Sequence, residues 1–434
     1  MYNFLANKTA EQKKMYGLIA IILAASLATL DGVIYRPALT GVPILLIVLF
    51  EHLLGFIFLA PFIYLGWNRI KNLTTKDWSS LVVVSLFGGL IGNFVLTKSF
   101  FVAVDNNTTL AAVIVLQKLQ PFFVIILARI FLKERLPQKF YIWATIAIMS
   151  AYFLSFGKEG VSFYDIANIN IINQAAFFAV LAALAYAFST VFSKRLLNHL
   201  DYKSTAALRY GATVLFTLPV VYFTGRFAMT SSISWEQWQN IFIIGVITGG
   251  ALFFIIHYWG LRFIPVSLTT IGELFFPLSA VVLDYFVHGS IMNSVQIVAA
   301  IILVISFYFV TRAGNLRLPR FTALTKQGGH GGKFIGFNTV ELDKKTIDID
   351  HGVYAVYARI NNKKYKGLVN FGFRETFHGG QHLELYLPDF VGNYYGLSVR
   401  IKMLKKIRDT KKFKNAEGLK ERIKQDLEEL DKIK

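Results

Sequence analysis

The chain contains no cysteine and has little charge for its length. The absence of cysteine excludes disulfides and thiol chemistry but leaves the compartment open. Charged residues make up 16% of the 434 residues and hydrophobic residues 55%, whereas soluble proteins carry roughly 25% charge. Acidic residues are scarcer than basic ones, with 26 Asp and Glu against 45 Lys and Arg. This composition predicts a large membrane part, and the length leaves room for two or three domains.

Hydrophobic stretches of roughly 20 residues, enough to cross about 30 Å of hydrocarbon, recur through the first three quarters of the chain. We expect ten transmembrane helices, at 15–36, 42–66, 78–98, 108–132, 138–157, 173–193, 203–224, 237–260, 264–287 and 292–312. Because ten is an even number, both termini are expected on the same side of the membrane.

The distribution of basic residues predicts which side that is. The segments on the side of the termini hold 17 Lys and Arg, and the opposite loops hold 4, which are Arg36, Lys98, Lys158 and Arg226. Lys and Arg accumulate in cytoplasmic loops, so we expect a multi-pass protein of the plasma membrane with cytoplasmic N- and C-termini. Orientation explains most of the excess positive charge of the membrane part. The expected partner is therefore the lipid bilayer, and not nucleic acid.

The two halves of the hydrophobic part resemble each other. The segment KLQPFFVIILARIFLKERL matches GELFFPLSAVVLDYFVHGS, with Pro121 and Pro277 as counterparts. Five spans repeated once, with the second copy inverted, are typical of an alternating-access carrier. On these segments, and on the run LKERL at Leu132–Leu136, the chain resembles the EamA-type repeat of the drug/metabolite transporter superfamily. The resemblance implies a transporter and leaves its solute open.

Charged side chains inside the spans are functional candidates, because a charge near the bilayer centre costs at least about 2.5–3.5 kcal/mol. Lys118 lies three residues before Pro121 and Glu273 four before Pro277, at comparable depths in repeat-related helices. We expect Lys118 and Glu273 to line a transport cavity, where they could pair or contact a polar solute. Other candidates, which could equally snorkel to an interface or be buried hydrogen-bonding groups, are Asp31, Glu51, His52, Arg209, His257 and Asp284.

From Gly328 the composition changes to glycine-rich turns, short strands and a charged terminal helix. The glycine cluster at 328–332 allows close backbone contact with an anion, although a flexible linker has the same composition. Strand-like runs separated by turn residues predict a small β-barrel, and they lie at 352–360, 365–371, 382–387 and 397–404. An amphipathic α-helix is expected at about 415–432.

Taken in order, these elements resemble the riboflavin kinase family over nearly all of residues 328–430. GGKFIGFNT is similar to its glycine-rich phosphate segment, HGVYAVYARINNKKYKGLVNFGFRETF to its central hairpin, and HLELYLPDF to the strand with the catalytic acid. The resemblance implies phosphorylation of riboflavin to FMN by ATP with Mg²⁺, without a tightly bound organic cofactor. The adenylyltransferase domain familiar from bacterial relatives is missing from this sequence, so FAD synthesis is not expected.

The resemblance also implies roles for single residues. Glu384 would be the general base that takes the proton from the ribityl 5′-hydroxyl, which requires hydrogen-bonding reach. Thr339 would contact the ATP phosphates and Mg²⁺, and Glu341 could serve the same ion, since carboxylates suit hard cations. The remaining nucleotide and phosphate contacts would come from Gly331, Gly332, Lys333 and Gly336.

One departure from the family leaves two functions open. The family pattern Pro-Thr-Ala-Asn is replaced by Asn338-Thr339-Val340-Glu341, which keeps only the threonine, and the charge of Glu341 could repel phosphate. The first hypothesis is a riboflavin transporter with a tethered kinase that traps riboflavin in the cell as FMN. The alternative is a small-metabolite transporter whose flavokinase-like tail binds flavin as a regulator without catalysis.

These patterns together predict the domain organisation. We expect a cytoplasmic tail at 1–14, EamA-like repeats at 15–157 and 173–312, a linker at 313–327 and a riboflavin kinase-like domain at 328–434.

Overall fold

The computed structural model divides the chain into two compact units, one formed by Lys14–Leu316 and the other containing Arg317–Lys434. The glycine-rich segment with Gly331, Gly332, Lys333 and Gly336 lies outside the described residues, and so does the side chain of Asp284. The residues that the structure describes are 10–105, 113, 116–156, 172–288, 291–313, 318, 320–326, 339–343, 352–373, 381–390, 392, 395–408, 416–431 and 433.

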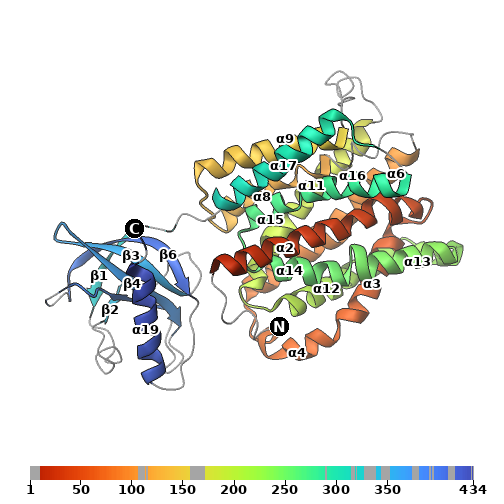
Figure 1. The fold of residues 1–434 in the computed structure, drawn as a ribbon. Helices are drawn as coiled ribbons and strands as arrows, with labels where there is room; N and C mark the ends of the chain where they lie inside the picture. Colours follow the sequence, from red (N-terminus) through yellow and green to blue (C-terminus); the bar gives the residue numbers. More distant parts are fainter. Residues whose placement is uncertain are drawn as a thin grey trace. The chain divides into compact units, whose positions relative to one another are not determined.

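The first unit is a bundle of α-helices (Figure 1). A π-helical segment at Val84–Ile91 joins α5 (Thr75–Val83) to α6 (Gly92–Asp105), and another at Ile244–Thr248 extends α13 (Trp235–Ile243) as far as the bends at Gly249 and Gly250. The helices are α2 (Ala10–Leu30), α3 (Ile44–Leu59), α4 (Pro61–Ile70), α5 (Thr75–Val83), α6 (Gly92–Asp105), α8 (Gln120–Phe131), α9 (Gln138–Phe156), α11 (Ile172–Leu197), α12 (Tyr202–Phe223), α13 (Trp235–Ile243), α14 (Ala251–Leu261), α15 (Val266–Gly272), α16 (Phe275–His288) and α17 (Ser294–Ala313).

The helices confirm a multi-pass membrane architecture. Among the described residues, seven helical runs are long and apolar enough to cross a membrane, and eight if α3 and α4, bent by 75°, form one span. The outward face of α17 exposes Ile301, Ile302, Val304 and Ile305, as a lipid-facing surface does. The predicted count of ten is not established, since two expected spans are not among these eight. The span at 108–132 is partly outside the described residues, and α8 within it has 12 residues; the span at 138–157 corresponds to α9, which is not among the helices that are long and apolar enough.

Both repeat-related helices are interrupted next to their prolines. Lys118 and Leu119 form a turn directly before α8, while Glu273 and Leu274 separate α15 from α16. A proline has no N–H for the carbonyl four residues earlier, which favours such an interruption. Discontinuous helices bring polar groups into the interior of transporter bundles.

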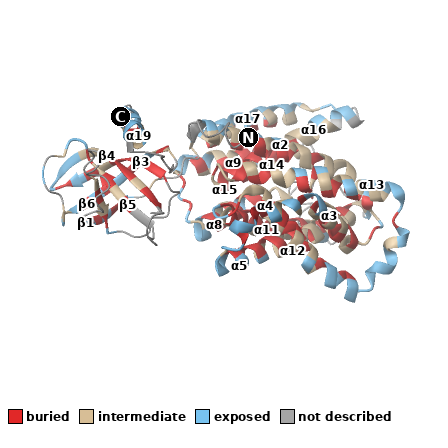
Figure 2. Ribbon diagram, turned by 90° about the horizontal axis from the view of Figure 1, so that it is seen from below, coloured by how far each residue is buried: buried red, intermediate tan, exposed pale blue. Residues whose placement is uncertain are grey.

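The buried residues of the bundle lie mainly on its inward faces (Figure 2).

The second unit is a closed antiparallel barrel with the strand order β1-β2-β5-β4-β3-β6, followed by a helix. This confirms the predicted small barrel and terminal helix. The first strand of the barrel, with the sequence RFTALTK, lies before residue 328, within the segment 313–327 that was expected to be a linker. The elements are β1 (Arg320–Lys326), β2 (Thr339–Leu342), β3 (Gly352–Ile360), β4 (Lys363–Phe373), β5 (Gln381–Tyr386), β6 (Ser398–Arg408) and α19 (Ala416–Asp431).

Alternating apolar residues fill the barrel. The side chains of Val340, Val369 and Leu385 are buried at neighbouring positions of β2, β4 and β5. The turn between β3 and β4 consists of Asn361 and Asn362, with φ values of 46° and 64°. Asn tolerates this left-handed conformation, which two-residue hairpins require. The Asn-Asn pair therefore fixes the register of the longest hairpin in the described part of the barrel.

The helix α19 covers one end of the outer barrel surface. Its Leu430 packs against Val353, Leu368 and Ile407 of three strands. Arg408 Nε of β6 donates to both carboxylate oxygens of Asp426, at 2.9 and 2.8 Å, and the Asp426 side chain is 1% exposed. Burial raises the pKa of Asp426 above its ordinary value, although Arg408 opposes the shift.

This raised pKa gives a testable pH dependence. The folded carboxyl keeps its proton to a higher pH than the unfolded one, so the folded state binds more protons in the window above the unfolded pKa of about 3.9. The contribution of Asp426 to stability should therefore fall as pH rises through this window. We expect the unfolding free energy of the parent, relative to Asp426→Asn, to decrease with pH. Denaturant unfolding, followed by a fluorophore on a cysteine introduced at exposed Lys363, measures it, and an increase would contradict the assignment.

Candidate functional site

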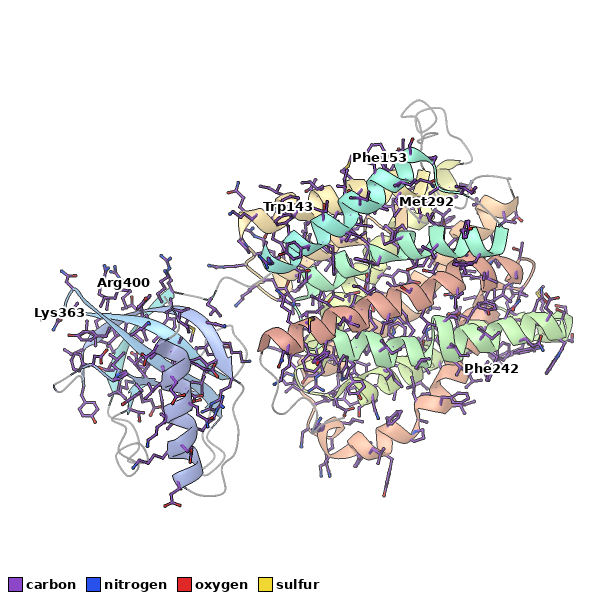
Figure 3. All side chains as sticks on the ribbon, viewed as in Figure 1. Trp143, Phe153, Phe242, Met292, Lys363 and Arg400 are labelled. Atoms are coloured by element: carbon purple, nitrogen blue, oxygen red, sulfur yellow. The ribbon has the colours of Figure 1, made fainter. Side chains whose placement is uncertain are left out.

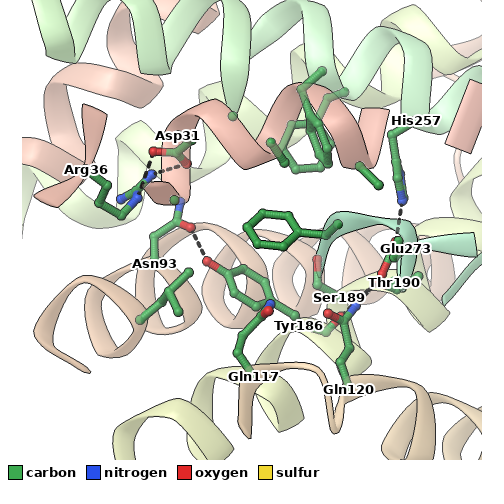
Figure 4. A pocket seen from close by; sticks show the side chains of 18 of the residues that line it. Asp31, Arg36, Asn93, Gln117, Gln120, Tyr186, Ser189, Thr190, His257 and Glu273 are labelled. Atoms are coloured by element: carbon green, nitrogen blue, oxygen red, sulfur yellow. Dashed lines mark hydrogen bonds and ion pairs between the residues drawn. The ribbon is translucent and has the colours of Figure 1, made fainter. Parts of the chain in front are cut away.

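A cavity of about 170 Å³ lies inside the helical unit (Figure 4). Lys118 and Glu273, the two charged residues at the interruptions of the repeat-related helices, both line it. Residues of α2, α6, α8, α11, α12, α14 and α16 also line it, together with Asp31 and Arg36. The helix interruptions therefore open onto a chamber to which both repeats contribute.

One part of the cavity lining is aromatic. Phe100, Phe253, Phe254 and Phe276 line it together with Tyr186. Flat rings of this kind offer stacking surfaces to a planar ligand, in offset or edge-to-face arrangements. The cavity thus joins an apolar, aromatic surface to a few polar groups, the usual composition of a site for a small organic molecule.

The polar groups at the helix interruptions have separate partners. His257 Nε2 and Glu273 Oε1 are 2.7 Å apart, and the two side chains are 6% and 17% exposed. Lys118 Nζ lies 4.1 Å from the centroid of the Phe276 ring. Within the described residues no ion pair joins Lys118 to Glu273. The structure thus brings Lys118 and Glu273 to one cavity but does not pair them with each other, which was one of the two possibilities considered from the sequence.

A second polar cluster, not expected as a unit from the sequence, lies at the other side of the cavity. Arg36, counted among loop residues above, is 3% exposed. It donates to both carboxylate oxygens of Asp31, at 3.0 and 2.9 Å, and to Glu51 at 3.2 Å. Asn93 donates to Glu51 at 2.9 Å and accepts from the Tyr186 hydroxyl. A buried guanidinium flanked by two carboxylates satisfies the requirement that charges inside a membrane protein be paired.

Arg209 and His52 lie deep in the same unit. Arg209 Nη1 donates to Ser189 Oγ at 2.8 Å and to the Tyr258 hydroxyl at 3.1 Å, and its guanidinium lies 4.1 Å from the centre of the Phe254 ring. His52 Nδ1 is 2.8 Å from a backbone carbonyl of its own helix. Arg209 is also one of the residues that line the cavity, whereas His52 is a buried hydrogen-bonding group of α3.

The run LKERL has a structural task. Glu134 accepts hydrogen bonds from the backbone N–H groups of Val266 and Ser267, at 2.8 and 3.3 Å, and from the Ser267 hydroxyl at 2.7 Å. These donors belong to the first turn of α15, where helix N–H groups lack intrahelical partners and favour a negative charge. Glu134 thus links the end of α8 in the first repeat to the interrupted helix of the second.

In the barrel, the structure brings Thr339, Glu341 and Glu384 together. Glu341 of β2 lies directly opposite Glu384 of β5, and Glu384 lies opposite Asn370 of β4. Thr339 is on the same face of β2 as Glu341, because Val340 between them points into the core. Residues opposite each other in antiparallel strands have Cβ atoms about 4.5–5.5 Å apart. Two carboxylates and a hydroxyl therefore share one outward patch.

This patch fits a hard divalent cation. Carboxylate and hydroxyl oxygens are suitable ligands, and Mg²⁺ is usually held by one or two carboxylates together with substrate phosphates. Among the described residues no group of three or more His, Cys, Asp or Glu is arranged to hold a metal. Thr339 and Glu341 alone offer one hydroxyl and one carboxylate, a donor set that suits an ion whose coordination is completed by nucleotide phosphates.

Two family models match the chain in the same two parts. The model of the EamA-like transporter family matches residues 15–156 and 173–312. The flavokinase model, described as riboflavin kinase, matches residues 318–434. The duplicated match supports the internal repeat, and both resemblances inferred from the sequence are confirmed.

Curated relatives fall into two corresponding groups. The riboflavin transporter ImpX of Fusobacterium nucleatum is 33% identical over 299 residues, which cover 68% of this chain and 97% of that protein. The RNA-binding riboflavin kinase RibR of Bacillus subtilis is 33% identical over 103 residues, 23% of this chain and 45% of that protein. The bifunctional riboflavin kinase/FMN adenylyltransferase of Bacillus subtilis is 36% identical over 108 residues, 24% and 34%. The chain spans less than half of either kinase.

Proposed function

This chain belongs to the EamA-like transporter family and carries a flavokinase domain at residues 318–434, and from this premise we propose that it imports riboflavin and phosphorylates it to FMN. One observation carries the proposal: both parts are similar to proteins named for the same molecule. The helical unit is similar to a riboflavin transporter over nearly all of that protein's length, and the barrel is similar to riboflavin kinases.

The chemistry of the cavity suits riboflavin. Its isoalloxazine ring is flat and neutral, with an imide N–H and two carbonyl groups at one edge. The aromatic lining offers stacking surfaces, Glu273 offers an acceptor, and Lys118 offers a donor. A ligand without net charge also avoids the large desolvation cost of moving an ion through the bilayer interior.

In the proposed kinase reaction, Glu384 accepts the proton of the ribityl 5′-hydroxyl as the oxygen attacks the γ-phosphorus of ATP. The bond between the γ-phosphorus and the bridging oxygen breaks, and ADP leaves. Thr339 and Glu341 would hold Mg²⁺, which supplies charge neutralisation on the phosphates when bound. Phosphoryl transfer depends mainly on positioning and charge, so these few side chains suffice beside the backbone contacts expected from Gly331, Gly332, Lys333 and Gly336.

The fusion gives transport a direction. The phosphate of FMN carries about −1.5 to −2 charges at pH 7, and moving such a charge into the interior of the bilayer is costly. FMN formed on the cytoplasmic side would therefore stay there. This requires the barrel to lie in the cytoplasm, as the distribution of Lys and Arg over the loops predicts.

Uptake by cells tests the substrate. Riboflavin auxotrophs that lack an importer of their own should accumulate labelled riboflavin when they express the full chain. An excess of unlabelled riboflavin should abolish the signal. Cells with the empty vector provide the baseline, and accumulation at that baseline, with the protein present in the membrane, would contradict riboflavin transport.

A second function is favoured by one observation, the placement of Glu341 opposite Glu384. With a glutamate in place of the family's asparagine, repulsion of ATP phosphates would leave a barrel that binds flavin and regulates transport without catalysis. Flavin binding can be followed by fluorescence quenching and ATP consumption by ADP release. Quenching without ADP release would favour the regulator, and FMN formation would exclude it.

A further inference from the structure

One outer surface of the barrel is strongly basic. Two rows of residues cross the strands β1, β6, β3 and β4 in register, and we call them together the basic face. One row is Thr322, Arg400, Arg359 and Lys364, and the other is Arg320, Lys402, Tyr357 and Lys366. Figure 3 shows the side chains of Arg400 and Lys363 pointing away from the barrel; Lys363 follows the turn between β3 and β4.

The basic face contains six cations and no acidic residue. Arg359 lies directly opposite Arg400 on one side and opposite Lys364 on the other. Like charges directly opposite each other destabilise a sheet. No carboxylate pairs with any of the six among the described residues, and Lys364 Nζ instead lies 3.4 Å from the centre of the Tyr357 ring. Among the described residues, the positive charge of the basic face is therefore left without a compensating carboxylate.

The other residues at the rim of this face suit a lipid interface. Leu324 lies two residues after Thr322 on the same outward face of β1, and it is 48% exposed. Tyr357 presents an aromatic ring with a polar end, which is favoured at the level of lipid headgroups. The opposite end of the outer surface is covered by α19, whose Leu430 packs on Val353 and Leu368. The basic face is thus the part of β3, β4 and β6 that the helix leaves open.

The short connection between the two units limits the distance of Arg320 from the bilayer. α17 ends at Ala313 and β1 begins at Arg320, so seven peptide steps separate them. A fully extended chain spans about 3.3–3.6 Å per residue, and Arg320 therefore lies no farther than about 25 Å from the end of a membrane span. Arg320 is itself part of the basic face, which gives the tethered barrel a high effective concentration at the lipid surface.

We propose that the basic face docks the barrel on anionic lipid headgroups of the membrane in which the helical unit lies. Anionic headgroups attract nearby Lys and Arg side chains, with the attraction confined to about a Debye length. In the closed order β1-β2-β5-β4-β3-β6, the strands β3 and β6 lie across the barrel from β2 and β5. Docking by the basic face therefore leaves the patch of Glu341 and Glu384 accessible to nucleotide.

The absence of cysteine from the chain allows a direct test. A fluorophore on Thr322→Cys in the full chain, placed in nanodiscs, reports energy transfer to acceptor-labelled headgroups. We expect higher transfer in discs of phosphatidylcholine with phosphatidylglycerol than in phosphatidylcholine alone, and loss of the difference in high salt. Arg359→Glu with Arg400→Glu should lower the ratio of docked to undocked barrel at least about tenfold.

Two controls make the outcome decisive. Lys420→Glu with Lys424→Glu, on exposed positions of α19, changes the net charge equally and should leave the transfer unchanged. Arg359→Gln with Arg400→Gln removes the two charges without reversing them, and it should lower the energy transfer in anionic discs by a smaller amount. This milder variant tests the basic face even if the charge-reversed variant misfolds. Equal transfer in neutral and anionic discs would overturn the proposal. Equal loss of docking in the α19 variant and in Arg359→Glu with Arg400→Glu would also overturn it. Binding of an RNA oligonucleotide by the basic face, with no effect of lipid, would do the same.

Discussion

Replacing Glu384 by Gln is expected to lower the rate of FMN formation by about 10²–10⁴-fold, the contribution typical of a general base. Glutamine has nearly the same shape and still accepts a hydrogen bond, but it cannot take the proton of the 5′-hydroxyl. Binding of riboflavin should change little, because the neutral vitamin gains no ionic contact with the carboxylate. The measurement is chromatography of FMN formed from riboflavin and MgATP by the full chain in detergent.

Glu421→Gln provides the matched control. Glu421 is an exposed carboxylate on α19, away from the patch of Thr339, Glu341 and Glu384. This variant should form FMN at the parental rate. A parental rate for Glu384→Gln would remove Glu384 from the reaction, and absence of FMN from the parent itself would leave the barrel as a binding domain.

Replacing Glu273 by Gln or Lys118 by Met should lower the initial rate of riboflavin uptake by about ten- to a hundredfold. Each substitution removes a charge from an interruption of a repeat-related helix, and Glu273→Gln also weakens the hydrogen bond with His257. Hydrogen bonds to charged groups contribute about 1.5–3 kcal/mol, which corresponds to this range of rates. Labelled uptake, normalised to the amount of folded protein in the membrane, measures the effect.

The control for the cavity is Lys139→Met. Lys139 is exposed at the start of α9 and does not line the cavity, so this variant should transport as the parent does. The two cavity variants should also form FMN normally when riboflavin is supplied directly in detergent. Parental uptake by both variants would show that the cavity is not the route of transport.

The sequence predicted the features that repeat locally. The strand-like runs at 352–360 and 365–371 predicted two neighbouring strands of the barrel. Lys118 and Glu273 were expected at comparable depths from their spacing to Pro121 and Pro277, and they line one cavity. Periodicity and proline position act over a few residues, so they can be recognised without knowledge of tertiary contacts.

Features that depend on distant residues could not be predicted in this way. Arg36 followed an apolar run and was assigned to a loop, whereas π-helical residues Asp31–Tyr35 carry it inward to two carboxylates. The only signal was the acidic residue five positions before it. The pairing of Glu134 with α15 joins residues more than 130 positions apart. β1 was missed because its short alternating run lies between the last span and the glycine-rich segment.

Reconstituted vesicles test the coupling of transport and phosphorylation most directly. The full chain in liposomes that contain MgATP only in the lumen receives labelled riboflavin from outside, and the flavin retained after washing is identified by chromatography. Retained FMN is expected, and it should disappear when MgATP is omitted from the lumen or when Glu384 is replaced by Gln. The parental chain must form FMN in detergent for this comparison. If the vesicles then retain only unmodified riboflavin, the transported vitamin is not delivered to the tethered kinase.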